Sequence, residues 1–247
     1  MITVGVLGAK GRMGAQVVQA VSSAANLSLV AELDLGDELE RFIESGAQVV
    51  VVFTTPDSVM ASLEFLITHN IDCVVGTTGF NEERIARISE LLSQHPKSGV
   101  LIAPNFAIGA VLMMEFAIKA AKYFESAEII ELHHPDKVDA PSGTAIRTAE
   151  LMTQSRRESA LDPVPDATTT SLDGARGAKV GDIAVHSIRV RGLVAHQEVI
   201  LGGLGETLTI RHDSIDRAGF MPGVLLGIRS VVSHPGLTVG LEHFMNK

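Results

Sequence analysis

The stretch ITVGVLGAKGRMG, residues 2–14, decides the fold of this chain. Its first half is almost entirely aliphatic, which is typical of a strand buried on both faces of a sheet. Gly8, Gly11 and Gly14 follow at once and lead into a helical pattern over residues 12–22. A strand, a glycine turn and a helix in this order open the nucleotide-binding half of a doubly wound α/β fold.

The rest of the first hundred residues repeats the alternation of strands and helices. Further strands are expected at 27–32, 48–53, 72–75 and 99–103, and helices at 37–45, 57–69 and 82–94. Val, Ile and Leu stand at consecutive positions in these strands, as they do in parallel sheets covered on both faces. The repetition predicts right-handed crossovers and a Rossmann-like doubly wound parallel sheet.

From residue 108 onward the pattern changes. We expect helices at 108–123 and 144–157, a strand at 127–133, and period-two segments at 183–190, 194–201 and 206–212. This alternation favours an α+β domain with a mainly antiparallel open sheet. A final helix at 215–232 and a strand at 237–240 are expected to return to the first sheet. The predicted division is therefore one domain at 1–106 and 215–247, and a second at 107–214.

Composition limits the classes of partner. Lys and Arg number 20 and Asp and Glu 29, a net charge of −9, and the basic residues do not cluster, which argues against a nucleic-acid partner. The single cysteine, Cys73, cannot form an intrachain disulfide, as expected in a reducing compartment. The start of the chain has no basic region and only a short apolar run. We expect a cytoplasmic protein that does not span a membrane.

The expected dinucleotide site has an acidic partner. Asp34 follows the second predicted strand, about twenty residues after the glycine turn, where a carboxylate meets the adenosine ribose. Asp34 should accept hydrogen bonds from a ribose 2′-hydroxyl and repel a 2′-phosphate, whereas Lys10 and Arg12 would offset that repulsion. We expect both NADH and NADPH to be used, with some preference for NADH.

Small residues follow three further predicted strands. They are Thr54 and Thr55 after the third strand, GTTG (76–79) after the fourth and APNF (103–106) after the fifth. Each alone is also an ordinary turn or helix cap. Ligands of open α/β sheets bind outside the carboxyl ends of the strands, so three such turns in one sheet favour a nicotinamide and ribose bound there.

The densest set of reactive side chains lies in ELHHPDKVDAPSGTA, residues 131–145. His133 and His134 titrate near neutral pH, Lys137 supplies a positive charge and a proton, and the helix that follows presents N–H groups to an anion. The stretch suits an anionic substrate and acid catalysis. Surface histidines and a plain helix cap would leave the same pattern. Adjacent histidines do not easily share one ion, so no metal is expected.

Read as E-L-H-H-x-x-K-x-D-A-P-S-G-T-A, this stretch resembles the signature of the dihydrodipicolinate (4-hydroxy-tetrahydrodipicolinate) reductase family. The resemblance covers the whole chain and includes the glycine turn, GTTG, APNF, and a C-terminal pattern of His212, Arg217, Phe220 and Gly223. It implies an oxidoreductase of diaminopimelate and lysine biosynthesis. Such enzymes take 4-hydroxy-tetrahydrodipicolinate, a small cyclic dicarboxylate, through loss of water and reduction by NADH or NADPH to tetrahydrodipicolinate.

The resemblance also implies roles for single residues. His133 would donate and accept a proton and Lys137 would be a second proton donor, while His134 and the amides of Gly143 and Thr144 would hold a substrate carboxylate. The implied cofactor contacts are Gly8, Ala9, Lys10, Gly11, Arg12, Met13, Asp34, Gly76, Thr77, Thr78, Ala103, Pro104, Asn105 and Phe106. Family members are commonly homotetramers, so the domain at 107–214 is expected to bind substrate and to form the oligomer. Leu35 stands where some relatives carry an arginine, which weakens the case for an NADPH preference.

Two other functions stay open on the residues alone. A dinucleotide-sensing regulator would also need a nucleotide domain, but it would normally carry a DNA-reading helix and a basic face. A Rossmann oxidoreductase acting on another small acid would share the architecture without the loop at 137–144. Consumption of NADH separates the enzyme from the sensor, and the substrate profile separates the two enzymes.

Overall fold

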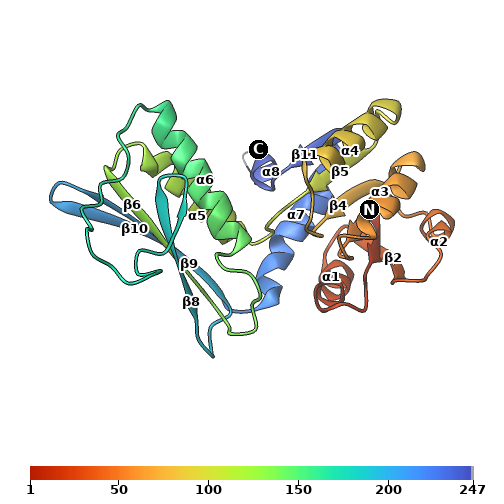
Figure 1. Ribbon diagram of the computed structural model, residues 1–247. Coiled ribbons are helices and arrows are strands. Elements are labelled where there is room, and N and C mark those ends of the chain that lie inside the picture. Colours follow the sequence, from red (N-terminus) through yellow and green to blue (C-terminus); the bar gives the residue numbers. More distant parts are fainter. Residues whose placement is uncertain (246–247) are drawn as a thin grey trace. The chain divides into compact units, whose positions relative to one another are not determined.

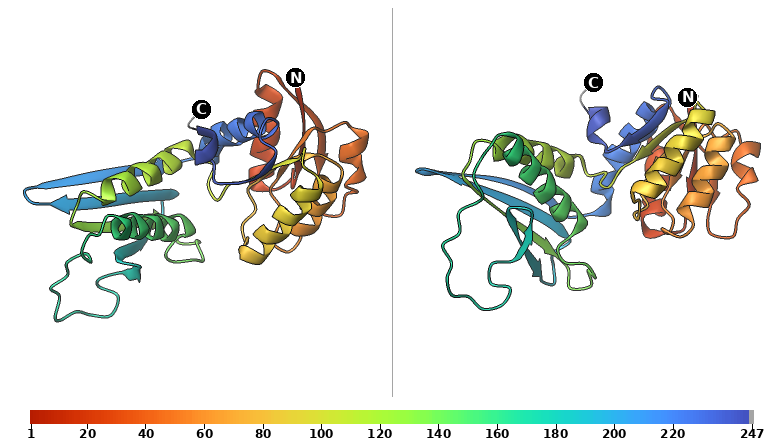
Figure 2. Two further views of the ribbon diagram at one scale, coloured as in Figure 1. Left: turned by 90° about the horizontal axis from the view of Figure 1, so that it is seen from above. Right: turned by 45° about the horizontal axis from the view of Figure 1, so that its top comes forward.

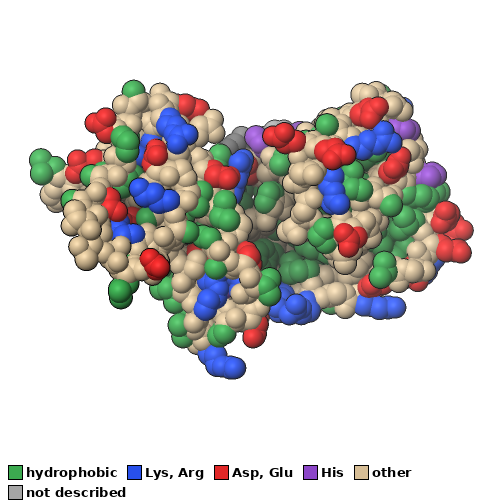
Figure 3. Space-filling view, viewed as in Figure 1, with side chains coloured by type: hydrophobic (Ala, Val, Ile, Leu, Met, Phe, Trp, Pro, Cys, Tyr) green, Lys and Arg blue, Asp and Glu red, His purple; other side chains and the backbone are tan. Residues whose placement is uncertain are grey.

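The computed structural model describes residues 1–245, which form two compact units (Figure 1). Unit 1 comprises Met1–Ile108 and Arg217–Lys247, and unit 2 comprises Gly109–Asp216. The boundaries expected from the sequence, after residues 106 and 214, differ from these by two residues each. On the face shown in Figure 3, acidic and basic side chains are interspersed on each unit. Within residues 1–245, no helix is both long enough and apolar enough to cross a membrane.

Unit 1 is built on a six-stranded parallel sheet. Its strands are β1 (Ile2–Leu7), β2 (Leu27–Leu33), β3 (Val49–Val52), β4 (Asp72–Val75), β5 (Gly99–Ile102) and β11 (Gly236–Val239), in the spatial order β11-β5-β4-β3-β1-β2. Every residue of β3 and β5 is buried, which explains their uninterrupted runs of aliphatic side chains. The chain order reverses between β1 and β3, and ligands of such sheets bind at this switch point. The doubly wound parallel sheet predicted from the sequence is confirmed.

Helices cover both faces of this sheet (Figure 2). They are α1 (Arg12–Ser23), α2 (Glu40–Glu44), α3 (Val59–Thr68), α4 (Glu82–Gln94), α7 (Met221–Val231) and the short α8 (Glu242–Met245). α3 and α4 pack on the core that contains Val75 and Ile102, whereas Gly227 of α7 lies against Val74 and Leu101. Successive residues of a strand point to opposite faces, so α7 lies across the sheet from α3 and α4.

The C-terminal segment belongs to the same sheet, because β11 pairs with β5 from Gly236↔Gly99 onward. The long helix expected at 215–232 is shorter than predicted. A 3₁₀ turn occupies Arg217–Phe220, and α7 begins only at Met221. Pro222 stands in the first turn of α7, where a residue without an N–H is tolerated. The short helix α8 was not expected.

Unit 2 contains a five-stranded sheet in the order β10-β9-β6-β8-β7. The strands are β6 (Ser126–His133), β7 (Ala178–Val180), β8 (Ile183–Arg189), β9 (Ala195–Gly203) and β10 (Glu206–Ser214). β6 and β8 run parallel and the other three pairings are antiparallel, so the sheet is mainly antiparallel, as predicted. The parallel pair and the three-residue β7 were not foreseen.

Two helices, α5 (Ile108–Ala121) and α6 (Gly143–Glu158), lie along this sheet (Figure 2). Their core with the sheet includes Met113, Met152, Ile129 and Val199. Along β6, buried residues alternate with half-buried ones, which leaves the second face of the sheet more open. This alternation places Glu131 on the face that packs against the helices.

Candidate active site

The glycine turn at residues 8–14 is packed so closely that two of its positions exclude a side chain. Gly8 has φ +88°, and a Cβ there would lie 2.2 Å from the carbonyl oxygen of Phe53. A Cβ at Gly14 would lie 1.9 Å from the carbonyl oxygen of Gly8. Gly11 is the N-cap of α1 and has no side chain to accept from the first N–H groups of the helix. The turn therefore fits a pyrophosphate, which those N–H groups can bind.

Asp34 lies directly beside this turn. Its Oδ2 accepts from the backbone N–H of Lys10 at 2.8 Å, and its Oδ1 accepts from the N–H of Leu35 at 2.9 Å. The bonds from Leu35 and then Lys10 hold the pKa of Asp34 below its usual value. Each carboxylate oxygen has a second lone pair, so the charged group can also accept from ribose hydroxyls. The hydrogen bond from Lys10 shows that Asp34 lies beside the glycine turn, while its expected contact with an adenosine ribose stays a prediction.

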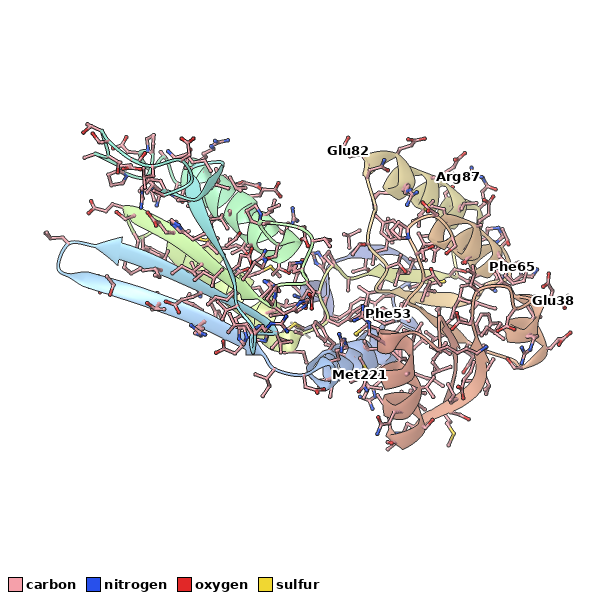
Figure 4. The ribbon with its side chains drawn as sticks, turned by 60° about the horizontal axis from the view of Figure 1, so that its bottom comes forward. Glu38, Phe53, Phe65, Glu82, Arg87 and Met221 are labelled. Carbon is pink, nitrogen blue, oxygen red and sulfur yellow. The ribbon has the colours of Figure 1, made fainter. Side chains whose placement is uncertain are left out.

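The ends of β3 and β4 meet next to the turn. The N–H of Thr54 donates to Oγ1 of Thr77 at 3.0 Å. A Cβ at Gly76 would lie 2.1 Å from the Phe53 ring, so a side chain at this position would displace the ring. The rings of Phe53 and Phe106 lie 5.9 Å apart, centroid to centroid (Figure 4 labels Phe53). Phe53 thus forms an apolar wall at the carboxyl edge of unit 1.

The remaining expected cofactor positions lie at the same edge. Ala103 follows β5 and donates its N–H to the carbonyl oxygen of Val75 at 3.0 Å. Asn105 accepts from the N–H of Ala107 at 2.8 Å and so shapes the chain just before α5. Parallel strands end at a common edge, so residues 76–78 and 103–106 lie on the same side of the sheet as the glycine turn.

In unit 2, the reactive stretch is organised around the carboxylate of Glu131, which is fully buried on β6. Arg189 at the end of β8 donates to it as a fork, with distances of 2.7 Å to Oε1 and 2.9 Å to Oε2. Nδ1 of His133 lies 2.6 Å from Oε2, and the N–H of Ser142 donates to Oε1 at 3.2 Å. Burial raises the pKa of Glu131, but the hydrogen bonds from Arg189, Ser187 and His133 outweigh it and hold this pKa below the ordinary value.

His133 is largely buried, with 14% of its side chain exposed. Burial is the main cause that lowers its pKa; Glu131 acts in the opposite direction, and Lys137 and Arg189 add to the lowering. The imidazole is therefore neutral at pH 7 when no ligand is bound. A carboxylate only accepts hydrogen bonds, so the single proton of the neutral ring sits on Nδ1 and Nε2 has a free lone pair.

The loop between β6 and α6 contains the other reactive groups. Nζ of Lys137 donates to Oδ1 of Asp139 at 2.6 Å, a bond that lowers the pKa of Asp139. The ammonium group has three N–H donors, so two are left for a ligand. At the start of α6, Ser142 caps the helix by accepting from Ala145, and a Cβ at Gly143 would meet no atom of the described residues within 4 Å. The N–H of Gly143 also bonds to the carboxylate of Asp139, which adds to the lowering of the pKa of that carboxylate.

The structure therefore gathers the expected residues into two sets, one on each unit. His133, His134, Lys137, Gly143 and Thr144 belong to one strand end, loop and helix start. Sequence reasoning missed the roles of Glu131 and Arg189. Glu131 stands two positions before His133 on a strand, which places both on one face, but nothing in the local sequence connects Arg189 to them. Among residues 1–245, no three His, Cys, Asp or Glu side chains are grouped so that they could hold a metal ion.

Comparison with known proteins assigns the chain to a family. The family model "Dihydrodipicolinate reductase, N-terminus" matches residues 2–106, and "Dihydrodipicolinate reductase, C-terminus" matches residues 109–245. The chain belongs to the dihydrodipicolinate reductase family. The resemblance carried by residues 131–145 is thereby confirmed, and residues 2–106 correspond to the dinucleotide-binding Rossmann domain of this family.

Individual relatives match over almost the whole chain. A 4-hydroxy-tetrahydrodipicolinate reductase of Streptomyces griseus subsp. griseus is 61% identical over 245 residues, which cover 99% of this chain and 98% of the relative. One from Corynebacterium diphtheriae is 59% identical, with 99% of each chain covered. A solved structure, dipicolinate-bound dihydrodipicolinate reductase from Paenisporosarcina sp. TG-14, superposes with a TM-score of 0.88 and 37% identity, and covers 98% of this chain and 99% of that one.

Because Gly14 has no space for a methyl group, Gly14→Ala is expected to open the glycine turn and weaken NADH binding by roughly tenfold or more, about 1.4 kcal/mol. Fluorescence titration with NADH measures this change. Gly219→Ala is the matched control, since a Cβ there meets no atom of the described residues within 4 Å, and it should bind as the unchanged chain does. Equal affinities in the two variants would contradict the assignment of the turn.

Proposed function

We propose that this chain catalyses the NAD(P)H-dependent reduction of 4-hydroxy-tetrahydrodipicolinate to tetrahydrodipicolinate, with loss of water, in diaminopimelate and lysine biosynthesis. Family membership and full-length relatives at about 60% identity that carry this enzyme name support the proposal. The observation that carries it is the loop of unit 2, where an imidazole bound to a buried carboxylate, an ammonium group and a helix start occur within a dozen residues.

Unit 2 supplies the groups that a small cyclic dicarboxylate requires. Two carboxylates need two separate sets of donors. His134 and the N–H groups of Gly143 and Thr144 would hold one carboxylate, with the dipole of α6 favouring its charge. Lys137, with two N–H donors left over from Asp139, would bind the substrate and donate a proton. The Paenisporosarcina relative is described as binding dipicolinate, itself a ring dicarboxylate.

A ring that takes up a hydride at one carbon gains electron density that a proton must neutralise. The dihydronicotinamide, when bound, supplies the hydride. On this chain, Nε2 of His133 exchanges the proton, because Nδ1 is engaged with Glu131. Burial holds the pKa of His133 low in the ligand-free state. Two substrate carboxylates nearby would raise that pKa, so His133 would take up a proton as the substrate binds.

We also propose that the coenzyme is bound through residues 8–13, Asp34, residues 76–78 and residues 103–106. Asp34 keeps lone pairs for the hydroxyls of an adenosine ribose, which favours NADH. Lys10 and Arg12 would moderate the repulsion of a 2′-phosphate, so NADPH is accepted as well. Leu35, which is largely exposed, adds no charge at this position.

Unit 2 is further proposed to form a homotetramer through its sheet. β10 is an edge strand, and its first residues, 206–209, are exposed. Leu208 on β10 and Leu204 in the turn between β9 and β10 expose apolar surface. An exposed edge strand with apolar side chains is a natural pairing surface.

The test of the proposed activity is a steady-state assay with freshly prepared 4-hydroxy-tetrahydrodipicolinate, in which loss of dihydronicotinamide absorbance is followed for NADH and for NADPH. We expect turnover with both and competitive inhibition by pyridine-2,6-dicarboxylate. Binding of NADH without consumption would instead indicate a sensor. Turnover only with other small acids, and no inhibition by the pyridine dicarboxylate, would indicate another oxidoreductase.

Replacing the proton-exchanging imidazole should affect the chemical step. His133→Gln is expected to lower kcat about 10²- to 10⁴-fold, the usual contribution of a positioned acid, without changing the Kd for NADH. His186→Gln is the matched control, because His186 lies on the same sheet and is also bound to a glutamate, Glu128. Near-normal turnover in His133→Gln would remove this residue from the mechanism.

Coenzyme preference tests the role of Asp34. Asp34→Ala should lower kcat/KM for NADH by about tenfold and that for NADPH much less, since only the 2′-hydroxyl loses an acceptor. Glu38→Ala, at an exposed position labelled in Figure 4, removes the same charge four residues away and should leave the ratio unchanged. Equal losses of kcat/KM with NADH and NADPH would show that Asp34 does not distinguish the 2′-hydroxyl from the 2′-phosphate of the ribose.

A further inference from the structure

The pairing of β6 with β8 brings three ionisable side chains to one point of unit 2. In this parallel pair, Glu131 stands opposite Ser187 and His133 opposite Arg189. Glu131 and His133 are two residues apart on β6, so their side chains project from the same face. Both terminal nitrogens of Arg189 donate hydrogen bonds to the carboxylate of Glu131.

The carboxylate of Glu131 is engaged on both oxygens. Oε2 accepts from Arg189 and from Nδ1 of His133, and Oε1 accepts from Arg189 and from the N–H of Ser142. The low pKa of Glu131 keeps it charged, so it cannot donate a proton back to the ring. A ring held in this way presents Nε2, and only Nε2, for proton exchange.

The same ion pair also fixes the loop that contains Lys137. The guanidinium of Arg189 donates to the carbonyl oxygen of Asp139 at 2.8 Å, while the carboxylate of Glu131 accepts from Ser142. The two contacts hold both ends of the segment 139–142. Lys137, which is bonded to the side chain of Asp139, is therefore linked to the ion pair that orients His133.

We propose that Glu131 and Arg189 are a positioning pair: Glu131 fixes the tautomer and orientation of His133 so that Nε2 exchanges the proton, and Arg189 compensates the buried carboxylate and holds the loop of Lys137. The proposal goes deeper into the proposed function and rests on it wherever activity is the readout. It assigns neither residue to direct contact with substrate or coenzyme.

Charges of both signs act on the pKa of His133. Glu131 on β6 favours the protonated imidazole, whereas Arg189 on β8 and Lys137 on the loop oppose it, and burial opposes it most. Removing the carboxylate should therefore lower the pKa of His133 further. Removing the guanidinium should leave the carboxylate uncompensated and raise the pKa of His133. A pair that merely stabilised the fold would not shift this titration in opposite directions.

The first experiment measures kcat/KM as a function of pH in Glu131→Gln and Arg189→Gln. The part of the profile that is lost in His133→Gln reports the titration of His133, and we call it the His133 limb. We expect the limb to move to lower pH by about one unit in Glu131→Gln and to higher pH by about one unit in Arg189→Gln. In both variants kcat should fall about tenfold or more. Shifts in the same direction, or an unmoved limb, would overturn the proposal.

The chain contains a close control on the same strand. Glu128 on β6 is bonded to His186 and to Arg176, so it forms a second set of glutamate, histidine and arginine away from the loop. Glu128→Gln should leave the limb and kcat unchanged. The same shift in this variant would show that any lost carboxylate on β6 alters the profile, which would contradict a specific role for Glu131.

The second experiment reads the tautomer directly and requires no turnover. In ¹⁵N spectra of histidine-labelled full-length chain at neutral pH, we expect His133 to appear as the Nδ1–H tautomer, and to become mixed or Nε2–H in Glu131→Gln. An Nε2–H tautomer in the unchanged chain would overturn the proposal. If the assay finds no reductase activity, the proposed function fails while this spectrum still decides the present point.

Folding is checked by thermal unfolding of each variant. Should Glu131→Gln fail to fold, Arg189→Lys carries the test, because it keeps the charge but loses the fork and the contact with Asp139. For this variant we expect an unmoved limb and a raised KM for the substrate, as the loop loosens. A shifted limb with an unchanged KM would contradict the division of roles between the two residues.

Discussion

The carboxylate of Glu131 is a full charge buried in the core of unit 2, and much of the local structure follows from its compensation. An isolated charge removed from water costs several kcal/mol, and breaking a buried ion pair typically costs about 3–5 kcal/mol. Arg189 lies against Glu131 and supplies the compensating charge, and it reaches the carboxylate from β8, which runs parallel to β6. The parallel pairing within a mainly antiparallel sheet thus brings the guanidinium to the carboxylate.

In the proposed function, the two units would bind their ligands through different kinds of groups. In unit 1, the glycine turn offers backbone N–H groups, and the carboxylate of Asp34 beside it is fixed by two backbone N–H groups that lower its pKa. In unit 2, His133 has a side chain that gains and loses protons, and its environment pushes its pKa away from the ordinary value. Fixed backbone dipoles suit the pyrophosphate of a coenzyme, which neither gains nor loses a proton, whereas proton transfer needs a titrating group.

Most of the fold of unit 1 was predictable because its strands are buried on both faces. Val49–Val52 and Gly99–Ile102 have no polar position, and this pattern has few other interpretations. Asp34 could be singled out as a candidate because the distance from a glycine turn to the end of the second strand is nearly constant in this fold. Unit 2 was harder. Alternation of polar and apolar residues shows that β6, β8 and β9 are strands, but it is the same for parallel and antiparallel neighbours, so the orientation of β8 could not be inferred. The three residues of β7 are too few to form a pattern.

The limits at the site have the same origin. His133 and Lys137 stand close together in sequence, and the signature they share with the family could be found by inspection. Arg189 lies 58 residues from Glu131, and only the sheet brings them together. A sequence motif contains the residues of one continuous stretch. The residues that position them can come from any neighbouring strand, so they do not form part of the motif. Glu131 is the first residue of the signature, but its ion pair with Arg189 depends on the register between β6 and β8. No local sequence pattern encodes that register. A fully buried glutamate two positions before a histidine on a strand is therefore a specific reason to search the neighbouring strand for a cation.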